Sequence, residues 1–200
     1  VQALPDTAIP EARAAAQAYN EGLWSSIVQY GSYSKDSVTS AVEEYAQLLD
    51  LTGTGTMGYV HIPKLAVSLP IYHGTEEETL DRGVGHLIGS SLPIGGSSTH
   101  AILTGHSGLA SQKMFSDLDK LEIGDTFYLE VLNEVLAYEV DQINTVLPHD
   151  TTYLGLEEGK DLCTLVTCTP FGVNTHRLLV RGHRISYTPE DSENPTMELA

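Results

Sequence analysis

Residues 161–186 read DLCTLVTCTPFGVNTHRLLVRGHRIS, with two strand-like runs, 161–168 and 176–186, on either side of a short loop. Apolar and β-branched residues dominate both runs, which is typical of strands that line a core. The loop between them contains Pro170 and Gly172, two residues that favour chain reversal. The sequence therefore predicts an antiparallel hairpin in this part of the chain.

Both cysteines of the chain lie on the first strand of this hairpin, five residues apart. An odd separation places Cys163 and Cys168 on opposite faces of a strand, with Cα atoms about 16 Å apart. A disulfide needs Cα atoms within about 7 Å, so we expect two free thiols. Cys163 stands in an apolar run and is expected to be a small buried side chain. Cys168 ends the strand, where a side chain can become accessible, and it is a candidate nucleophile.

An antiparallel return would bring Arg177 back beside Cys168. A guanidinium there can favour the thiolate and stabilise the oxyanion of a tetrahedral intermediate. Acyl transfer by a thiolate also needs a proton donor for the leaving amine, usually a histidine. His106 is the best placed, since it follows a strand and is flanked by two glycines that allow close approach by a substrate chain. His176 and His183 share a strand with Arg177 and remain alternatives. Structural or solvated roles are expected for His61, His73 and His149.

The rest of the sequence predicts an all-β protein with short helices, preceded along the chain by an N-terminal helical appendage. Alanine-rich residues 10–30 favour a helix, 31–41 read as a polar linker, and 41–50 as a second short helix before the glycine-containing break at 52–56. Further strands are expected at 58–62, 66–72, 100–104, 125–132 and 135–146, with a tight turn at Asn133-Glu134 and short helices at 76–82 and 114–121. Seven or eight strands with such frequent turns indicate a barrel or a sandwich.

Composition excludes several function classes. With 10 Lys and Arg against 27 Asp and Glu, the net charge of −17 argues against nucleic acid and against electrostatic adhesion to an anionic membrane. Two cysteines exclude an all-cysteine metal site, and neither a phosphate-binding loop nor a dinucleotide fingerprint is present. No run of about 18 apolar residues occurs, and the first residues do not read as a signal peptide. We therefore expect a soluble, processed or truncated part of a longer protein.

Acidic residues are unevenly distributed along the chain. None occurs in residues 82–116, which contain His106, or in residues 162–189, which contain Cys168 and Arg177. Because a nearby carboxylate disfavours a thiolate, the sequence predicts a locally basic site without acidic neighbours.

Residues 164–184, TLVTCTPFGVNTHRLLVRGHR, resemble the signature region of sortases, which carry Thr-Leu-x-Thr-Cys and an Arg on the following strand. Other segments are similar to the class C, pilin-polymerising sortases of Gram-positive bacteria: MGYVHIPKLAVSLPIYHGT (57–75), GVGHLIGSSLPIGG (83–96), AILTGHSGL (101–109) and FSDLDKLEIGDTFY (115–128). The resemblance covers about residues 57–187.

This resemblance implies a closed eight-stranded β-barrel that carries out transpeptidation at a Leu-Pro-x-Thr-Gly-like sorting signal. Cys168 would be the nucleophile, His106 the general acid and base, and Arg177 the group that stabilises the oxyanion. Thr167, Thr104 and Gly105, which stand next to these residues, would bind substrate; no metal or cofactor is implied. The implied partners are pilin subunits that supply the sorting signal and an acceptor Lys, and the implied location is the extracellular face of the membrane or the cell wall, with the protein acting as a monomer.

The expected organisation is an N-terminal helical and lid region at 1–56, a catalytic barrel at 57–187 and an acidic tail at 188–200. Class C sortases carry a lid with an Asp-Pro-aromatic anchor, and no proline of this chain follows an aspartate; Tyr30-Gly31-Ser32-Tyr33 stands where the anchor would be. Two alternatives remain open: a housekeeping-type sortase that attaches proteins to peptidoglycan, and a catalytically silent barrel that binds wall peptides or pilins.

Overall fold

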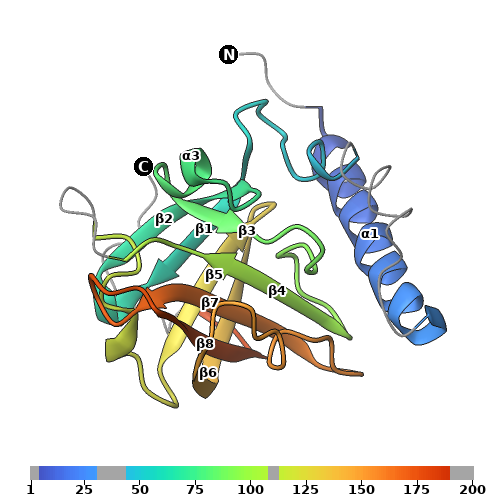
Figure 1. Cartoon of the computed structure of the whole chain (residues 1–200). Coiled ribbons are helices and arrows are strands. Elements are labelled where there is room, and N and C mark those ends of the chain that lie inside the picture. Colours follow the sequence, from blue (N-terminus) through green and yellow to red (C-terminus); the bar gives the residue numbers. More distant parts are fainter. Residues whose placement is uncertain (1–4, 31–43, 108–112, 190–200) are drawn as a thin grey trace.

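The computed structural model describes residues 5–30, 44–107 and 113–189, and its centre is a closed β-barrel (Figure 1). The eight strands follow one another around the barrel in the order β1-β2-β3-β4-β7-β8-β6-β5. Two neighbouring pairs, β2 with β3 and β4 with β7, are parallel, and the other six are antiparallel. The predicted all-β fold is confirmed, and the barrel is closed as the resemblance implied.

Seven of the eight strands occur where the sequence predicted them. They are β1 (Thr56–Ile62), β2 (Val67–His73), β4 (Thr99–Thr104), β5 (Thr126–Val131), β6 (Glu134–Val146), β7 (Asp161–Thr169) and β8 (His176–Ile185). The strand that the sequence did not reveal is β3 (Val84–His86), whose three residues are too few to show a period of two. It matters for the site because it joins β2 to β4.

Local details differ from the prediction in three places. The turn between β5 and β6 lies one residue earlier than expected, because Leu132 and Asn133 both adopt left-handed conformations with φ of 51° and 59°. The helix expected at 114–121 is only a 3₁₀ turn, η2 (Leu118–Lys120). Within the helix expected at 41–50, the described part is helical at Glu44 and Tyr45 and continues as turns.

The polar linker and residues 31–33 of the expected lid anchor fall on residues 31–43, which lie outside the described part of the chain, as do residues 190–200 of the expected tail.

Inward-facing side chains fill the barrel. Phe127 of β5 and Tyr138 of β6 stack with ring centroids 5.6 Å apart, and Cys163 and Leu165 of β7 are fully buried in the same cluster. Alternation along β7 thus decides which cysteine belongs to the core, as the spacing predicted.

The remaining described short helices, η1 (Pro63–Leu65) and α3 (Glu77–Leu80), connect neighbouring strands.

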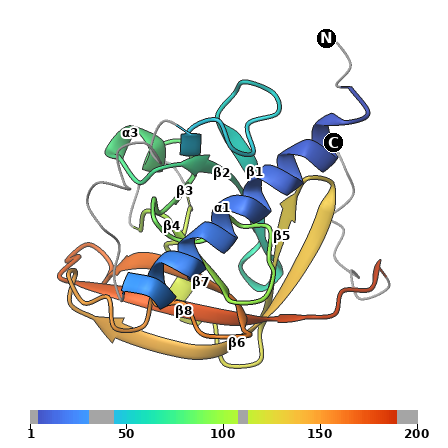
Figure 2. The ribbon, with the colours of Figure 1, turned by 90° about the vertical axis from the view of Figure 1, so that its right-hand side faces the viewer.

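Helix α1 (Ala8–Tyr30) runs obliquely across one side of the barrel (Figure 2). Ala16 of the helix is fully buried against the barrel core, and Asn20 attaches the helix to the chain between β3 and β4. The Asn20 Nδ2 donates to the Leu92 carbonyl (3.2 Å), and the Leu92 N–H donates to the Asn20 Oδ1 (2.7 Å). Neither α1 nor any other helix in the described ranges combines the length and the apolar character that a bilayer crossing requires.

We expect Asn20→Ala to weaken the attachment of α1. The substitution leaves the buried N–H of Leu92 unpaired and removes one of the two donors to its carbonyl, which still accepts from the Ile94 N–H (2.8 Å). This should lower the free energy of unfolding by about 2 kcal/mol. Thermal unfolding would then occur roughly 4–8 °C lower. Gln17→Ala, one turn earlier and exposed, is the matched control and should shift the midpoint by less than about 2 °C. Equal shifts for both variants would contradict the anchoring role of Asn20.

Candidate active site

Cys168 and Arg177 are direct cross-strand neighbours near the loop end of the β7–β8 hairpin. Side chains of a strand alternate between faces, and Cys163 points into the core, so Cys168 points outward. Arg177 shares this outer face, and its Nη1 donates to the carbonyls of His176 (3.1 Å) and Asn174 (3.3 Å). A guanidinium has five N–H donors, so others remain for a substrate. The proximity predicted from the hairpin is confirmed.

His106 reaches the same end of the barrel from β4, the parallel neighbour of β7. The residues on either side of it are bonded to the strand of the cysteine: the Gly105 N–H donates to the Val166 carbonyl (3.0 Å), and the Ser107 hydroxyl donates to the Cys168 carbonyl (2.8 Å). His106 is thereby held beside Cys168. The contact of Ser107 was not predicted, and only its position directly after His106 could have suggested it.

A cavity of about 30 Å³ lies beside Cys168. It is lined by Ser107, Ser116, Asp119, Thr167, Cys168, Thr169, Phe171 and Leu178. Since one water molecule needs roughly 10–15 Å³ of such space, the cavity admits a small group and not a peptide. A peptide substrate must therefore lie along the outer face of the sheet, where Cys168 and Arg177 are presented.

The three residues expected to bind substrate lie in different environments. Thr104 has the same parity along β4 as the outward Ile102 and is half-buried, next to Val166 of β7. Thr167 is 3% exposed, and its hydroxyl donates to the Gly105 carbonyl (2.8 Å). This hydrogen bond fixes the backbone directly before His106, so the hydroxyl proton is not available to a substrate.

Gly105 requires a different explanation from the one its sequence context suggested. We expected the glycine to let a substrate approach closely, but the residue is buried, and a Cβ there would lie 2.7 Å from the Phe115 ring. Packing against Phe115 is therefore what requires a glycine at this position.

The other histidines are engaged elsewhere. Both ring nitrogens of His61, His73, His86 and His100 have hydrogen-bond partners. Burial lowers the pKa of His86 to about 4, so it is neutral at physiological pH. His149 is exposed, and His176 accepts from or donates to the Thr175 hydroxyl (2.9 Å). The Nδ1 of His183 lies 3.6 Å from the carboxylate of Asp141. On β8, His183 is opposite Leu162, whereas Cys168 is opposite Arg177, so this alternative to His106 lies away from Cys168.

The expectation of a site free of acidic neighbours is wrong. The carboxylate of Asp81 lies 3.6 Å from the Nε2 of His106, and Asp119 lines the cavity beside Cys168. Asp81 directly precedes the acid-free stretch 82–116, and Asp119 follows it shortly after its end. The fold brings both aspartates back to the site around His106 and Cys168.

The second acid-free stretch is not locally basic in the structure either. Arg181 donates to Asp141 (2.9 Å) and Glu157 (2.8 Å), and Arg184 donates to Asp161 (3.3 Å). Of the three arginines on β8, Arg177 is the one without a carboxylate partner among the described residues. Its charge therefore remains available at the site.

Cys163 is excluded as a nucleophile by its surroundings. The side chain is fully buried, and burial raises the pKa of its thiol well above the usual range. Both cysteines are free, as predicted. Cys168 is thus the accessible thiol of the chain.

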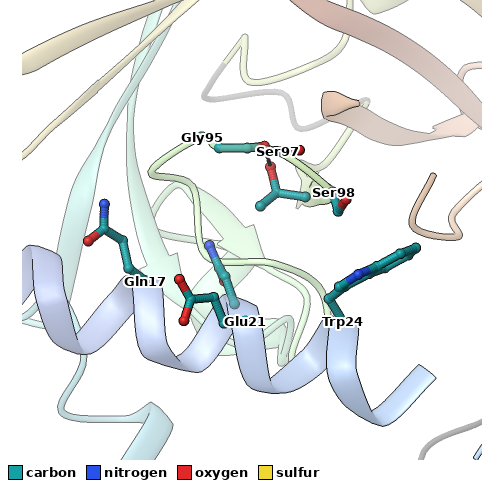
Figure 3. Close-up of a pocket in the computed structure, with 9 residues that line it drawn as sticks. Gln17, Glu21, Trp24, Gly95, Ser97 and Ser98 are labelled. Carbon is teal, nitrogen blue, oxygen red and sulfur yellow. Dashed lines mark hydrogen bonds between the residues drawn. The ribbon is translucent and has the colours of Figure 1, made fainter. Parts of the chain in front are cut away.

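A larger cavity, of about 360 Å³, lies between α1 and the loop before β4 (Figure 3). Gln17, Glu21 and Trp24 line it from the helix, and the loop residues from Gly95 to Ser98 line the other side. This loop enters β4, whereas His106 follows the other end of that strand, so the cavity contains none of the predicted site residues. Cavity size alone does not locate the chemistry here.

The arrangement combines an outward thiol, a guanidinium directly opposite that has no carboxylate partner in the described part of the chain, and a histidine whose two neighbours are hydrogen-bonded to the strand of the cysteine. These groups can perform nucleophilic attack, oxyanion stabilisation and proton transfer, which together constitute acyl transfer through a thioester.

Comparisons with known proteins agree with this geometry. Residues 60–185 match the sortase domain model. Sortase D of Bacillus subtilis (strain 168) is 30% identical over 161 residues, which cover 79% of this chain and 77% of that protein. The crystal structure of sortase C1 from Streptococcus agalactiae superposes with a TM-score of 0.82 at 49% identity, with 90% of each chain covered. Sortase C of Streptococcus pneumoniae, whose structure addresses pilin substrate specificity, gives 0.80 at 44% identity over 92% of this chain and 91% of that one. The chain belongs to the sortase family of cysteine transpeptidases.

Proposed function

We propose that this protein is a class C sortase that joins pilin subunits through isopeptide bonds. The observation that carries the catalytic part is the cross-strand pairing of Cys168 with Arg177 beside His106. The pilin part is supported by the similarity to sortase C1 of S. agalactiae and to sortase C of S. pneumoniae over about nine-tenths of the chain. Its place of action would be the outer face of the membrane or the cell wall, where pili are assembled.

In the first half-reaction, the thiolate of Cys168 attacks the Thr carbonyl carbon of a Leu-Pro-x-Thr-Gly-like sorting signal. The negative charge that develops on the carbonyl oxygen is stabilised by the guanidinium of Arg177. The bond between the Thr carbonyl and the Gly nitrogen then breaks, and the imidazolium of His106 gives its proton to the departing Gly amine. The product is a thioester between the Thr carbonyl and the Sγ of Cys168.

In the second half-reaction, the ε-amine of a pilin Lys attacks the thioester carbon. His106, now neutral, takes a proton from the attacking nitrogen, and the C–S bond breaks to regenerate the thiolate of Cys168. The new bond is an isopeptide between the Thr carbonyl and the Lys side chain. Arg177 stabilises the second tetrahedral intermediate in the same way as the first.

The outer face of the barrel supports the binding of an extended apolar peptide leading to Cys168. Val166 and Leu179 form a cross-strand pair two residues from the Cys168–Arg177 pair. They belong to an apolar cluster outside the barrel in which they are 7% and 3% exposed, with Leu87 and Leu154 packed against it. Thr104 lies beside Val166 on β4. We propose that the Leu and Pro of the sorting signal lie at the rim of this cluster, beside the half-buried Thr104, because the cluster residues themselves are already covered.

An acceptor competition tests this function. The protein is incubated with a sorting-signal peptide together with equal concentrations of a pilin domain containing its acceptor Lys and of a peptidoglycan stem-peptide amine. We expect the peptide to be joined to the pilin domain, as an added mass that maps to one Lys. A pilin domain in which that Lys is replaced by Arg is the matched control and should give no product.

Joining to the stem-peptide amine in preference to pilin would overturn pilin polymerisation in favour of cell-wall anchoring. Binding of the sorting peptide without any thioester on Cys168 would overturn both and favour a silent binding barrel.

A further inference from the structure

The side chain of His106 has a charged neighbour that the chemistry described above does not use. Its Nε2 is buried and has no hydrogen-bond partner among the residues that the structure describes. The nearest charged group is the carboxylate of Asp81, whose Oδ1 lies 3.6 Å from this nitrogen. Since that distance is slightly longer than a hydrogen bond, a small rotation of either side chain would form one.

Topology explains why two residues 25 positions apart meet. Strand β3 pairs antiparallel with β4, with Gly85 opposite Thr104. The residues that precede β3 therefore lie beside the residues that follow β4, which places Asp81 at the level of His106. Asp81 ends helix α3, and its N–H donates to the Glu77 carbonyl (2.9 Å), so its backbone is held in place.

We propose that Asp81 is a positioning residue that orients His106 and favours its imidazolium form. A carboxylate next to Nε2 stabilises a proton on that nitrogen in both states of the ring, and it stabilises the positive charge of the imidazolium. The other ring nitrogen, Nδ1, is left to exchange protons with the thiol, the leaving amine and the incoming amine. This inference deepens the proposed transpeptidase function and rests on it for the role of His106.

The other charged groups around His106 do not replace Asp81. Cys168 on β7 and Arg177 on β8 belong to the reacting set, and the positive charge of Arg177 disfavours the imidazolium. Phe115, whose N–H donates to the His106 carbonyl, belongs to a segment in which Lys113 and Asp117 form an ion pair at 3.3 Å. Among the described residues, Asp81 is thus the carboxylate within 4 Å of the ring.

A link to catalysis follows from the usual order of the two ionisations. A cysteine thiol ordinarily ionises near pH 8.5 and an imidazolium near 6.5, so the neutral pair predominates between them and the reactive thiolate–imidazolium pair is a minor form. Any group that favours the imidazolium increases this minor form. Asp81 would therefore raise the rate near neutral pH, and would have no effect at acid pH, where His106 is protonated in either case.

The test is the pH dependence of kcat/KM for the sorting peptide, measured for the unmodified protein and for Asp81→Asn. We expect the variant to be slower at neutral pH by about two- to fivefold, with an acidic limb that moves to lower pH. Below this limb the two rates should converge. Because Asp81 is 60% exposed, added salt should reduce the difference by slowing the unmodified protein alone.

Two variants separate charge from structure. Asp81→Glu keeps the carboxylate and should recover part of the rate and of the limb position. Glu77→Gln removes an exposed carboxylate from the same short helix and should behave as the unmodified protein. A loss that is uniform over all pH values, or one shared by Glu77→Gln, would overturn the proposal, as would Asp81→Asn with an unchanged profile.

Alkylation of Cys168 by iodoacetamide over the same pH range separates this inference from the proposed function. The reagent needs only the thiolate, so its profile reports on the Cys168–His106 pair whether or not pilin is joined. A shifted alkylation profile in Asp81→Asn supports the role of Asp81 even where the acceptor competition fails. An unshifted one overturns it even where the competition succeeds.

Discussion

Replacement of Cys168 by Ala is expected to abolish the reaction. The variant lacks the outward thiol that we propose forms the thioester, so the rate of peptide transfer should fall by roughly 10⁴-fold or more. Intact-mass spectrometry after incubation with the sorting peptide should show the acyl adduct on the unmodified protein and none on the variant. The hydrogen bond from Ser107 reaches the backbone carbonyl of Cys168, so the variant should retain the fold.

Cys163→Ala provides the matched control on the same strand. This thiol is fully buried and faces the interior of the barrel, where burial raises its pKa and keeps it protonated. The control should form the acyl adduct at nearly the normal rate and lose about 1 kcal/mol of stability through the small cavity. An adduct that persists in Cys168→Ala, or one that disappears in Cys163→Ala, would show that Cys168 is not the nucleophile.

His106→Gln is expected to produce the second largest loss. The amide is similar in size and polar, but it can neither protonate the leaving Gly amine nor accept a proton from the incoming amine. General acid–base catalysis typically contributes 10²–10⁴-fold, so kcat/KM should fall by about that factor. The measurement is steady-state release of the Gly-containing fragment, with folding verified by an unchanged thermal midpoint.

The two histidines of β8 test whether this role is unique to His106. His176→Gln and His183→Gln remove side chains that contact Thr175 and face Asp141, and both should leave kcat/KM within about threefold of normal. If His176→Gln produced the large loss and His106→Gln did not, the general acid would have to be reassigned to β8.

Strand periodicity predicted much of this molecule because it depends on local chemistry. Alternating apolar residues located seven strands, and their parity alone placed Cys163 inside and Cys168 outside. The hairpin turn after Cys168 was enough to bring Arg177 opposite it. Strand β3 escaped detection because three residues with a glycine in the middle show no period, and its partners β2 and β4 are separate segments of the sequence.

Charge distribution along the chain was a poor guide to charge distribution in space. The acid-free stretches suggested a basic site, but Asp81 and Asp119 reach it from just beyond the ends of one stretch, and Arg181 and Arg184 of the other are neutralised by carboxylates of β6, β7 and the loop between them. A linear count cannot detect this, because neighbours in a barrel are set by strand order.

The sequence by itself determined the β-rich fold class, the family, and the identity of the candidate nucleophile, base and arginine. These depend on local periodicity, on turn residues and on contiguous motifs. Only the tertiary structure decided the order of strands around the barrel, the engagement of Thr167 and Gly105 in packing, and the meeting of Asp81 with His106. Each of these depends on which distant segments the barrel closes against one another, and that pairing is a property of the whole core and not of any one stretch of residues.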